Sequence, residues 1–459
     1  KPDLKEFNMM SFNPVSIDTI MIRGYEAALA QDSLLRVVAE KTAGKYYPKK
    51  KKPASAMAGD SLVIANVDIK GVLPREKELL KERLDLKYGQ KISREDLDHI
   101  VAQIYGTQAY DFVTYELSGK GEPFDLILNC KKGPIHQFGL GVRADTEEIV
   151  SVLINLGLNA HKLHGHCYDF TAKISANPYV QFKWSYDVPK VPTLNALASV
   201  RWTDLNMLDF GSNRLSFSYL ASRQEFFMSN ITWKHMDMKA GLRNEIIRVR
   251  NVKSSQFIGD YDFSQLNNDF VSVFAEADTY TFDDGYFPTR GIDAGLSYSW
   301  TFAGFPNAID NFHTLRADGK FVIPLGNVFA FIPSFDFRLL FGHDIPVAYF
   351  NAMGGALPSR FVDQQMPFIG VNHISAMKNI LTIFRTDYRF KLAKNHYVTG
   401  ILNYARDCDT FRDYTNGLGY FGAGLEYAFD TIFGPLKADI HWSNLTNKVG
   451  FYISAGYNF

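Results

Sequence analysis

The residues best suited to chemistry in this chain are charged side chains on neighbouring segments. Asp387 lies on the polar face of a predicted strand, residues 383–390, and the long segment before it, residues 342–376, carries Arg360 followed directly by Phe361. An interruption of that length between strands is usually functional or disordered. Guanidinium and carboxylate groups form short, directional hydrogen bonds. These residue types therefore suit an ion pair that holds a loop in place.

Three histidines and a cysteine could be mistaken for a metal site. His161, His164, His166 and Cys167 fall within one short stretch, and imidazole and thiolate groups are common zinc ligands. Strand alternation points His164 and His166 one way and Cys167 the other. A solvent-exposed turn between strands is the favoured interpretation, so we predict no metal and no cofactor. The cysteines also lack a paired spacing that would indicate disulfides.

No catalytic residue is predicted. The Gly-x-Ser-x-Gly turn that exposes a lipase nucleophile is absent from the sequence, and its nearest relatives, residues 59–63 and 295–299, lack the second glycine. No other nucleophile has an identifiable base partner. The chain is therefore expected to be catalytically silent.

Composition and alternation favour a membrane barrel. The 459 residues include 37 Phe and 24 Tyr, and lipid-facing strands use many aromatic rings. No apolar run approaches the length of a transmembrane helix, whereas spanning strands alternate. The formal net charge of +0 does not support a nucleic-acid partner. Sixteen strands are predicted, near 137–145, 148–159, 166–177, 178–188, 193–204, two within 212–251, 268–281, 290–302, 311–323, 327–341, 377–391, 394–406, 416–429, 434–444 and 449–459.

The last strand shows the alternation most clearly. From Val449 to Phe459 the odd positions are apolar or aromatic and the even positions are small or polar, as in a strand with one apolar face. Taken alone, the segment also suits the last strand of a soluble sandwich. The number of such strands and the lack of any covering element favour the barrel.

This region resembles the outer-membrane surface-antigen superfamily, which includes barrel-assembly proteins, two-partner secretion transporters and patatin-fused lipases. In that family a loop before the twelfth strand folds into the lumen and carries an Arg followed by Gly and an aromatic residue. Here Phe361 follows Arg360 directly, so the glycine is missing. The resemblance implies that Arg360 and Phe361 lock a plugging loop, residues 342–376, against Asp387 on the wall.

Two further matches follow from the same resemblance. The sequence Tyr286-Phe-Pro-Thr-Arg-Gly291 resembles a Phe-Pro-x-x-Gly turn of the family, in which Phe287, Pro288 and Gly291 have a structural role. A terminal aromatic such as Phe459 resembles the assembly signal that the barrel-assembly machinery reads.

The N-terminal part is predicted to contain three units. Residues 1–48 hold two helices, and Arg23-Gly-Tyr-Glu-Ala-Ala28 resembles the closing helix of patatin-like phospholipases. Residues 49–59 form a basic and small-residue linker, which could alternatively bind anionic lipid head groups. Residues 60–133, with order β-α-α-β-β, resemble a polypeptide-transport-associated (POTRA) domain. Residues 134–459 form the barrel.

The predicted protein is a bacterial outer-membrane barrel in contact with lipid, with its POTRA domain in the periplasm. Its barrel would anchor, and help to export, an attached patatin-like lipase whose Ser-Asp dyad lies outside this chain. The alternative is a barrel-assembly or protein-translocation factor of the same superfamily, and a passive pore is a third possibility. Because residues 1–30 show no export signal, we expect the chain to be part of a longer protein.

Overall fold

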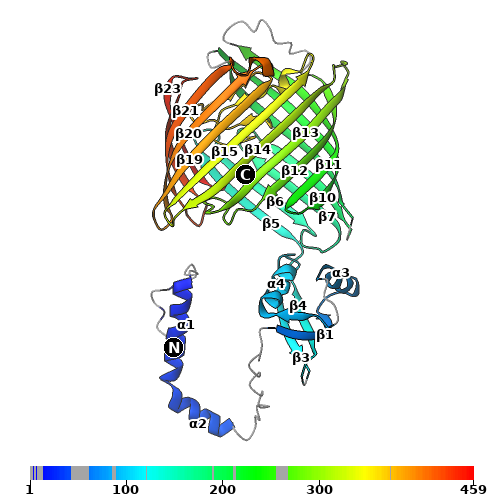
Figure 1. Cartoon of the computed structure of the whole chain (residues 1–459), viewed down its shortest axis with the longest axis vertical. Coiled ribbons are helices and arrows are strands. Elements are labelled where there is room, and N and C mark those ends of the chain that lie inside the picture. The colour runs from blue at the N-terminus through cyan, green and yellow to red at the C-terminus, as the bar shows by residue number, and fades with distance from the viewer. Residues whose placement is uncertain are drawn as a thin grey trace. The chain divides into compact units, whose positions relative to one another are not determined.

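The fold is that of a computed structural model. In the chain, a pair of helices and a small four-stranded sheet precede a large β-barrel (Figure 1). The structure describes Leu4, Phe7 and residues 14–42, 61–84, 89–119, 121–188, 191–209, 213–254, 267–372 and 374–459. The predicted linker, residues 49–59, lies outside the described residues. The other domain boundaries remain predictions.

Two helices come first, α1 (Pro14–Leu29) and α2 (Asp32–Thr42). Both agree with the predicted helical segments. Among the described residues, no helix is long and apolar enough to cross a bilayer.

A four-stranded sheet follows, with strand order β2-β1-β4-β3. Its elements are β1 (Ser61–Lys70), α3 (Pro74–Leu84), β2 (Lys91–Ser93), α4 (Arg94–Tyr105), β3 (Tyr110–Ser118) and β4 (Phe124–Lys132). The predicted order omits β2, because three residues are too few to show alternation and the strand forms by pairing with β1. The predicted start of α4 is confirmed, since Ser93 and Asp96 cap each other, with the Asp96 N–H 3.1 Å from Ser93 Oγ and the Ser93 N–H 2.9 Å from Asp96 Oδ2.

The rest of the chain forms a closed antiparallel barrel, as predicted. Within the described residues the wall has sixteen strands, because β15 pairs directly with β19 and β23 closes onto β5. The strands are β5 (Gln137–Asp145), β6 (Ile149–Leu158), β7 (Gly165–Ile174), β8 (Tyr179–Asp187), β9 (Thr193–Asp209), β10 (Asn213–Trp233), β11 (Met236–Ser254), β12 (Asp269–Tyr280), β13 (Gly291–Phe305), β14 (Phe312–Leu325), β15 (Phe329–Gly342), β19 (Ile380–Ala393), β20 (His396–Cys408), β21 (Leu418–Phe429), β22 (Leu436–Ser443) and β23 (Lys448–Gly456).

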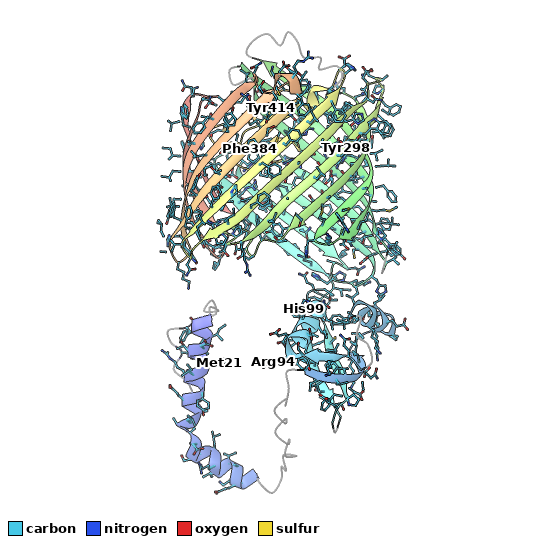
Figure 2. The ribbon with its side chains drawn as sticks, in the orientation of Figure 1. Met21, Arg94, His99, Tyr298, Phe384 and Tyr414 are labelled. Atoms are coloured by element: carbon cyan, nitrogen blue, oxygen red, sulfur yellow. The ribbon has the colours of Figure 1, made fainter. Side chains whose placement is uncertain are left out.

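The barrel wall is apolar outside and polar inside. On β23, Val449, Phe451 and Ile453 are 70%, 62% and 50% exposed, whereas Tyr452 and Ser454 are each 7% exposed. Outward aromatic side chains such as Phe384 and Tyr298 are distributed over the wall (Figure 2). This arrangement is the reverse of a soluble barrel and fits a wall surrounded by lipid.

Pro333 is accommodated by a local break in one ladder, as its missing N–H requires. Between β14 and β15, Lys320 pairs with Ser334 and Ile323 pairs with Phe331, and the two positions between them are unpaired. On its other side Pro333 remains in register with Thr386. The strand therefore continues through the proline by its pairing with β19.

Candidate functional site

The loop between β15 and β19 is folded rather than irregular. It contains the 3₁₀ helix η2 (Val347–Tyr349) and the short strands β16 (Asn351–Met353), β17 (Gln365–Met366) and β18 (Ile374–Met377). Strand β16 pairs with both β17 and β18, and β18 pairs in parallel with the end of β9. Strand β9 is far from β19 in the strand order of the wall. The loop therefore crosses the lumen from one wall to another.

An apolar core fixes the loop to the neighbouring wall. Met353, Met366 and Phe368 from the loop are fully buried, and they pack with Leu381 and Ile383 from β19. Burying side chains of this size stabilises the fold by about 1.5–3 kcal/mol each. The loop is therefore part of the folded barrel and occupies the space that an open channel would need.

Arg360 is buried at the loop tip and contacts three carboxylates. Its Nη2 donates to Asp145 and, at 3.2 Å, to Glu148, and its Nη1 lies 3.3 Å from Glu147. Nη1 also donates to the hydroxyl of Tyr452 on β23 at 3.4 Å. The side chain of Arg360 is 2% exposed. The predicted cation is thus a loop anchor, held by the end of β5 and the turn that follows it.

The predicted partner of Arg360 is wrong. Asp387 accepts instead from Arg385, with Nε at 2.7 Å and Nη2 at 3.0 Å. Residues that are two positions apart on a strand lie on the same face of the sheet. Arg385 and Asp387 therefore pair with each other within β19. The carboxylates of the β5–β6 turn escaped the prediction because they are distant in sequence, although the acidic run Asp145-Thr-Glu-Glu148 was a visible signal.

Phe361 lies beside the anchor and is half-buried. Its ring packs against the buried cluster that includes Leu205, Val362 and Ile374, and its N–H donates to Gln365 Oε1 at 2.9 Å. The aromatic residue therefore keeps the loop tip against β9, while Arg360 reaches toward β5.

Arg360 belongs to a charge-balanced group that we call the seam cluster. Arg143 donates to Asp145 at 3.0 Å and to Glu148 at 2.8 Å, and Lys173 donates to Glu148 at 2.8 Å. All of these side chains are almost inaccessible to solvent. Loss of one partner would leave a buried charge unpaired. The cluster consists of Arg143, Asp145, Glu147, Glu148, Lys173 and Arg360.

Burial shifts the pKa of one carboxyl group of the seam cluster. It raises the pKa of Glu147 to about 7, although Arg360 and the N–H of Ala356 act in the opposite direction. The Ala356 N–H donates to Glu147 Oε1 at 3.0 Å. Glu147 therefore changes charge near neutral pH while in contact with the loop.

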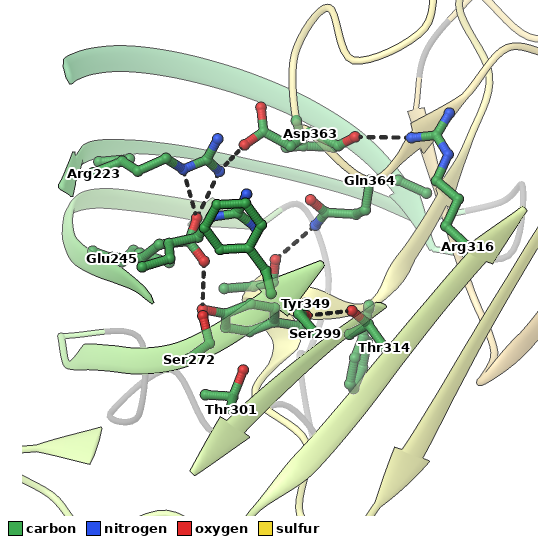
Figure 3. Close-up of a pocket in the computed structure, with 18 of the residues that line it drawn as sticks. Arg223, Glu245, Ser272, Ser299, Thr301, Thr314, Arg316, Tyr349, Asp363 and Gln364 are labelled. Atoms are coloured by element: carbon green, nitrogen blue, oxygen red, sulfur yellow. Dashed lines mark hydrogen bonds and ion pairs between the residues drawn. The ribbon is translucent and has the colours of Figure 1, made fainter. Parts of the chain in front are cut away.

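A second anchor of the loop is Asp363, which the sequence did not single out. Its carboxylate accepts from Arg201 at 3.1 Å and from Arg223 (Figure 3). Arg223 also donates to Glu245 at 2.6 Å, and Glu245 accepts from the hydroxyl of Tyr349 at 2.8 Å. These contacts tie both halves of the loop to β9, β10 and β11.

The seam between β5 and β23 is the shortest ladder of the wall. Three residue pairs join the strands, Asp145–Ser454, Ala144–Ala455 and Arg143–Gly456, whereas the next shortest ladder among the described residues, between β6 and β7, has seven. Asp145 on β5 also accepts a hydrogen bond from Arg360, and the hydroxyl of Tyr452 on β23 accepts a second one. The loop anchor therefore contacts both strands of the seam.

The chain leaves the wall after Gly456, so the predicted strand to Phe459 is three residues too long. Gly456 has φ +108°, and a Cβ there would lie 2.2 Å from the carbonyl oxygen of Val142. The Phe459 carbonyl accepts from Arg143 at 3.1 Å, and its ring lies 4.9 Å from that guanidinium. The terminal aromatic thus contacts the seam cluster. Its role in assembly remains a prediction.

The β12–β13 turn, residues 281–290, contacts two strands of the wall besides the two that it connects. Phe287 stacks on Tyr397 of β20 at 4.2 Å, and the Pro288 carbonyl accepts from Arg389 of β19. Gly291 has φ +117°, and a Cβ there would lie 2.5 Å from Thr281 O. The turn therefore contacts β19 and β20, two wall strands that are not adjacent to it, and the structural role of the motif stays a prediction.

A closed, lipid-facing barrel with a folded loop in its lumen defines an outer-membrane β-barrel protein. The sequence profile of the OMP85 superfamily matches residues 181–459. The chain belongs to the OMP85 superfamily.

Solved structures agree with this fold. BamA from Haemophilus ducreyi lacking POTRA domains 1–3 aligns with a TM-score of 0.63 at 13% identity, covering 88% of this chain and 85% of that one. CdiB from Acinetobacter baumannii aligns with a TM-score of 0.50 at 11% identity, covering 87% of this chain and 74% of that one. No curated protein sequence matches. At these identities the likeness concerns the fold.

Proposed function

We propose that this protein moves polypeptides into or across the outer membrane through the seam between β5 and β23. The observation that carries the proposal is the three-pair ladder at the seam. Each backbone hydrogen bond contributes about 0.5–1.5 kcal/mol, so the backbone pairing at this seam is the weakest in the described wall. The membership in the OMP85 superfamily supports this function over a passive pore, and a lumen occupied by a folded loop suits a pore poorly.

The loop and the seam are physically connected in this proposal. Asp145 pairs with Ser454 through the backbone and accepts from Arg360 through its side chain. Separation of β23 from β5 would also separate Tyr452 from Arg360. The position of the loop and the state of the seam therefore influence each other, so a substrate that displaces the loop would weaken the seam.

The small sheet would supply the substrate-binding element. Strand β3, nine residues long, lies at the edge of the sheet. An edge strand with free N–H and C=O groups can pair with an extended peptide. This role rests on the predicted POTRA identity and periplasmic location of residues 60–133. The prediction of an attached patatin-like lipase rests on residues 23–28 alone and stays a prediction.

A disulfide across the seam tests the proposal. Ala144 and Ala455 are direct neighbours in the register and both face outward, within the geometry that a disulfide needs. The double substitution Ala144→Cys/Ala455→Cys, made after replacing the free cysteines Cys130, Cys167 and Cys408 by serine, is expected to stop insertion of an unfolded barrel protein into proteoliposomes. Reductant should restore activity.

The matched control places the same bond in a long ladder. Leu402 and Ala423 pair between β20 and β21, also on the outer face, and their disulfide should leave activity unchanged. Full activity of the oxidised seam variant, with the disulfide confirmed by gel mobility, would contradict the proposal. A barrel inactive in every form but conducting ions would favour the passive pore.

A further inference from the structure

A cavity of about 360 Å³, lined by both charged and apolar side chains, lies in the lumen between the loop and the wall from β9 to β15 (Figure 3). This volume falls within the range of small-molecule sites. Five arginines line the cavity, and three of them donate to carboxylates at hydrogen-bond distance. These pairs are Arg201–Asp363 at 3.1 Å, Arg223–Glu245 at 2.6 Å and Arg243–Glu225 at 2.6 Å.

Arg316 on β14 is incompletely paired. The nearest carboxylates, Asp318 and Asp336, lie 3.4 and 3.6 Å away. Its Nη1 donates to the backbone carbonyl of Asp363 at 3.3 Å. Its buried Nε is the atom 3.4 Å from Asp318 Oδ1, and among the described residues it forms no hydrogen bond of regular geometry. A buried donor without a well-aligned acceptor is costly, so this guanidinium favours an additional anionic partner.

Arg338 on β15 lies directly opposite Arg316 in the antiparallel register. Like charges in that position repel. Arg338 is 6% exposed and, within the described part of the chain, forms no ion pair. Its Nη1 donates to uncharged oxygens, Tyr349 O at 2.9 Å and Asn351 Oδ1 at 2.6 Å. Arg338 is thus a buried guanidinium without a carboxylate partner among the described residues, and it faces Arg316, which is partly exposed and has only two long ion pairs, across the same cavity.

We propose that Arg316 and Arg338 bind an oxyanion, a carboxylate or phosphate group, inside this cavity. Such a group accepts several charge-assisted hydrogen bonds and matches the planar guanidinium. The hydroxyls of Ser299 and Thr314, 2.6 Å apart, line the same cavity and provide neutral donors. The oxyanion belongs either to a free small molecule or to an acidic side chain of a polypeptide in the lumen.

The site is linked to the loop through Arg338. This side chain holds the loop at Tyr349 and Asn351, and the Tyr349 hydroxyl donates to Glu245 in the same cavity. A bound anion would relieve the repulsion between the two arginines and so stabilise the loop in the lumen. This inference goes beyond the proposed function, because it holds whether or not the seam opens.

Calorimetric titration of the purified protein in detergent tests the site. Sodium phosphate represents a free anion, and two acetylated, amidated peptides, one with glutamates and one with glutamines, represent the polypeptide source. We expect the wild type to bind phosphate or the glutamate peptide, and Arg316→Gln to weaken that binding at least tenfold. Arg248→Gln is the matched control, since Arg248 already pairs with Asp269 at 2.6 Å and lies outside the cavity lining.

The results of these titrations distinguish the two sources of the oxyanion. Binding of phosphate supports a free anion, and binding of the glutamate peptide alone supports an acidic side chain. Equal binding by Arg316→Gln and the wild type, or no binding of any probe by the wild type, would overturn the proposal.

Discussion

The guanidinium of Arg360 donates to the carboxylate of Asp145 across 215 residues of sequence. Asp145 has a second task, because its Oδ1 accepts from the N–H groups of Glu147 and Glu148 at 2.8 Å each and so shapes the turn after β5. One carboxylate therefore organises the turn, pairs with Ser454 across the seam and holds the loop.

Replacing Arg360 by alanine should release the loop tip and destabilise the barrel. Removing one partner of a buried charge network costs about 3–5 kcal/mol, so the folded yield should fall and the single-channel conductance or its noise should rise. Asp145→Asn should have much the same effect, and the double variant should be little worse than either single one. Asp387→Asn is the control, because that carboxylate pairs with Arg385. Its effect should add to that of Arg360→Ala, so a double variant Arg360→Ala/Asp387→Asn no worse than Arg360→Ala alone would contradict the assigned partners.

Asp363→Asn should loosen the other anchor of the loop with a smaller effect. The Asp363 side chain is 42% exposed, so the loss should be about 1 kcal/mol. Limited proteolysis of the folded barrel should cut residues 342–376 faster than in the wild type. Asp409→Asn, which removes a more exposed pair with Lys378, should leave the cleavage rate unchanged.

Stability should decline as the pH rises from 6 to 8. The pKa of Glu147 is about 7 in the folded protein against an ordinary value of 4.5. Its contribution is therefore fully present below pH 4.5 and is lost as the pH rises through 7; the whole loss is up to about 3 kcal/mol, of which about 1.3 kcal/mol falls between pH 6 and pH 8. Arg360, Asp145 and Glu148 remain charged neighbours throughout. Midpoints of heat modifiability at both pH values measure the decline.

Glu147→Gln provides the check on that assignment. The amide does not titrate, so the difference between pH 6 and pH 8 should shrink. An unchanged pH dependence in Glu147→Gln would place the titrating group elsewhere.

Deleting Phe459 should lower the yield of assembled barrel more than it lowers the stability of barrels already formed. The ring contact with Arg143 is worth about 0.5–2 kcal/mol, which leaves a folded barrel stable. Yield and thermal midpoint of heat-modifiable protein measure the two effects. Phe433→Ala, at an aromatic residue that is 76% exposed, is the control. Equal yields of assembled barrel with and without Phe459 would contradict a role of this residue in assembly.

The wall could be predicted from the sequence because alternation is a local property. Each residue of β23 or β15 shows by its own polarity which face it occupies, and the wall strands lie close to the predicted ranges. The exceptions also have local causes. Strand β2 is too short to alternate, and β23 ends at Gly456 because the positive φ and the nearby Val142 carbonyl turn the chain away.

The contacts that make up the candidate functional site could be identified only from the tertiary structure. Arg360 could be identified as a buried cation from its place in a long loop, but its partner could not, since Asp387 has a nearer cation in Arg385. Closure of β23 onto β5 brings Asp145 and Glu148 to the loop tip, and only pairing across the whole chain determines that neighbourhood. For the same reason Asp363 and the opposed Arg316 and Arg338 became visible only in the folded barrel, because the charges that face a lumen come from strands distant in sequence.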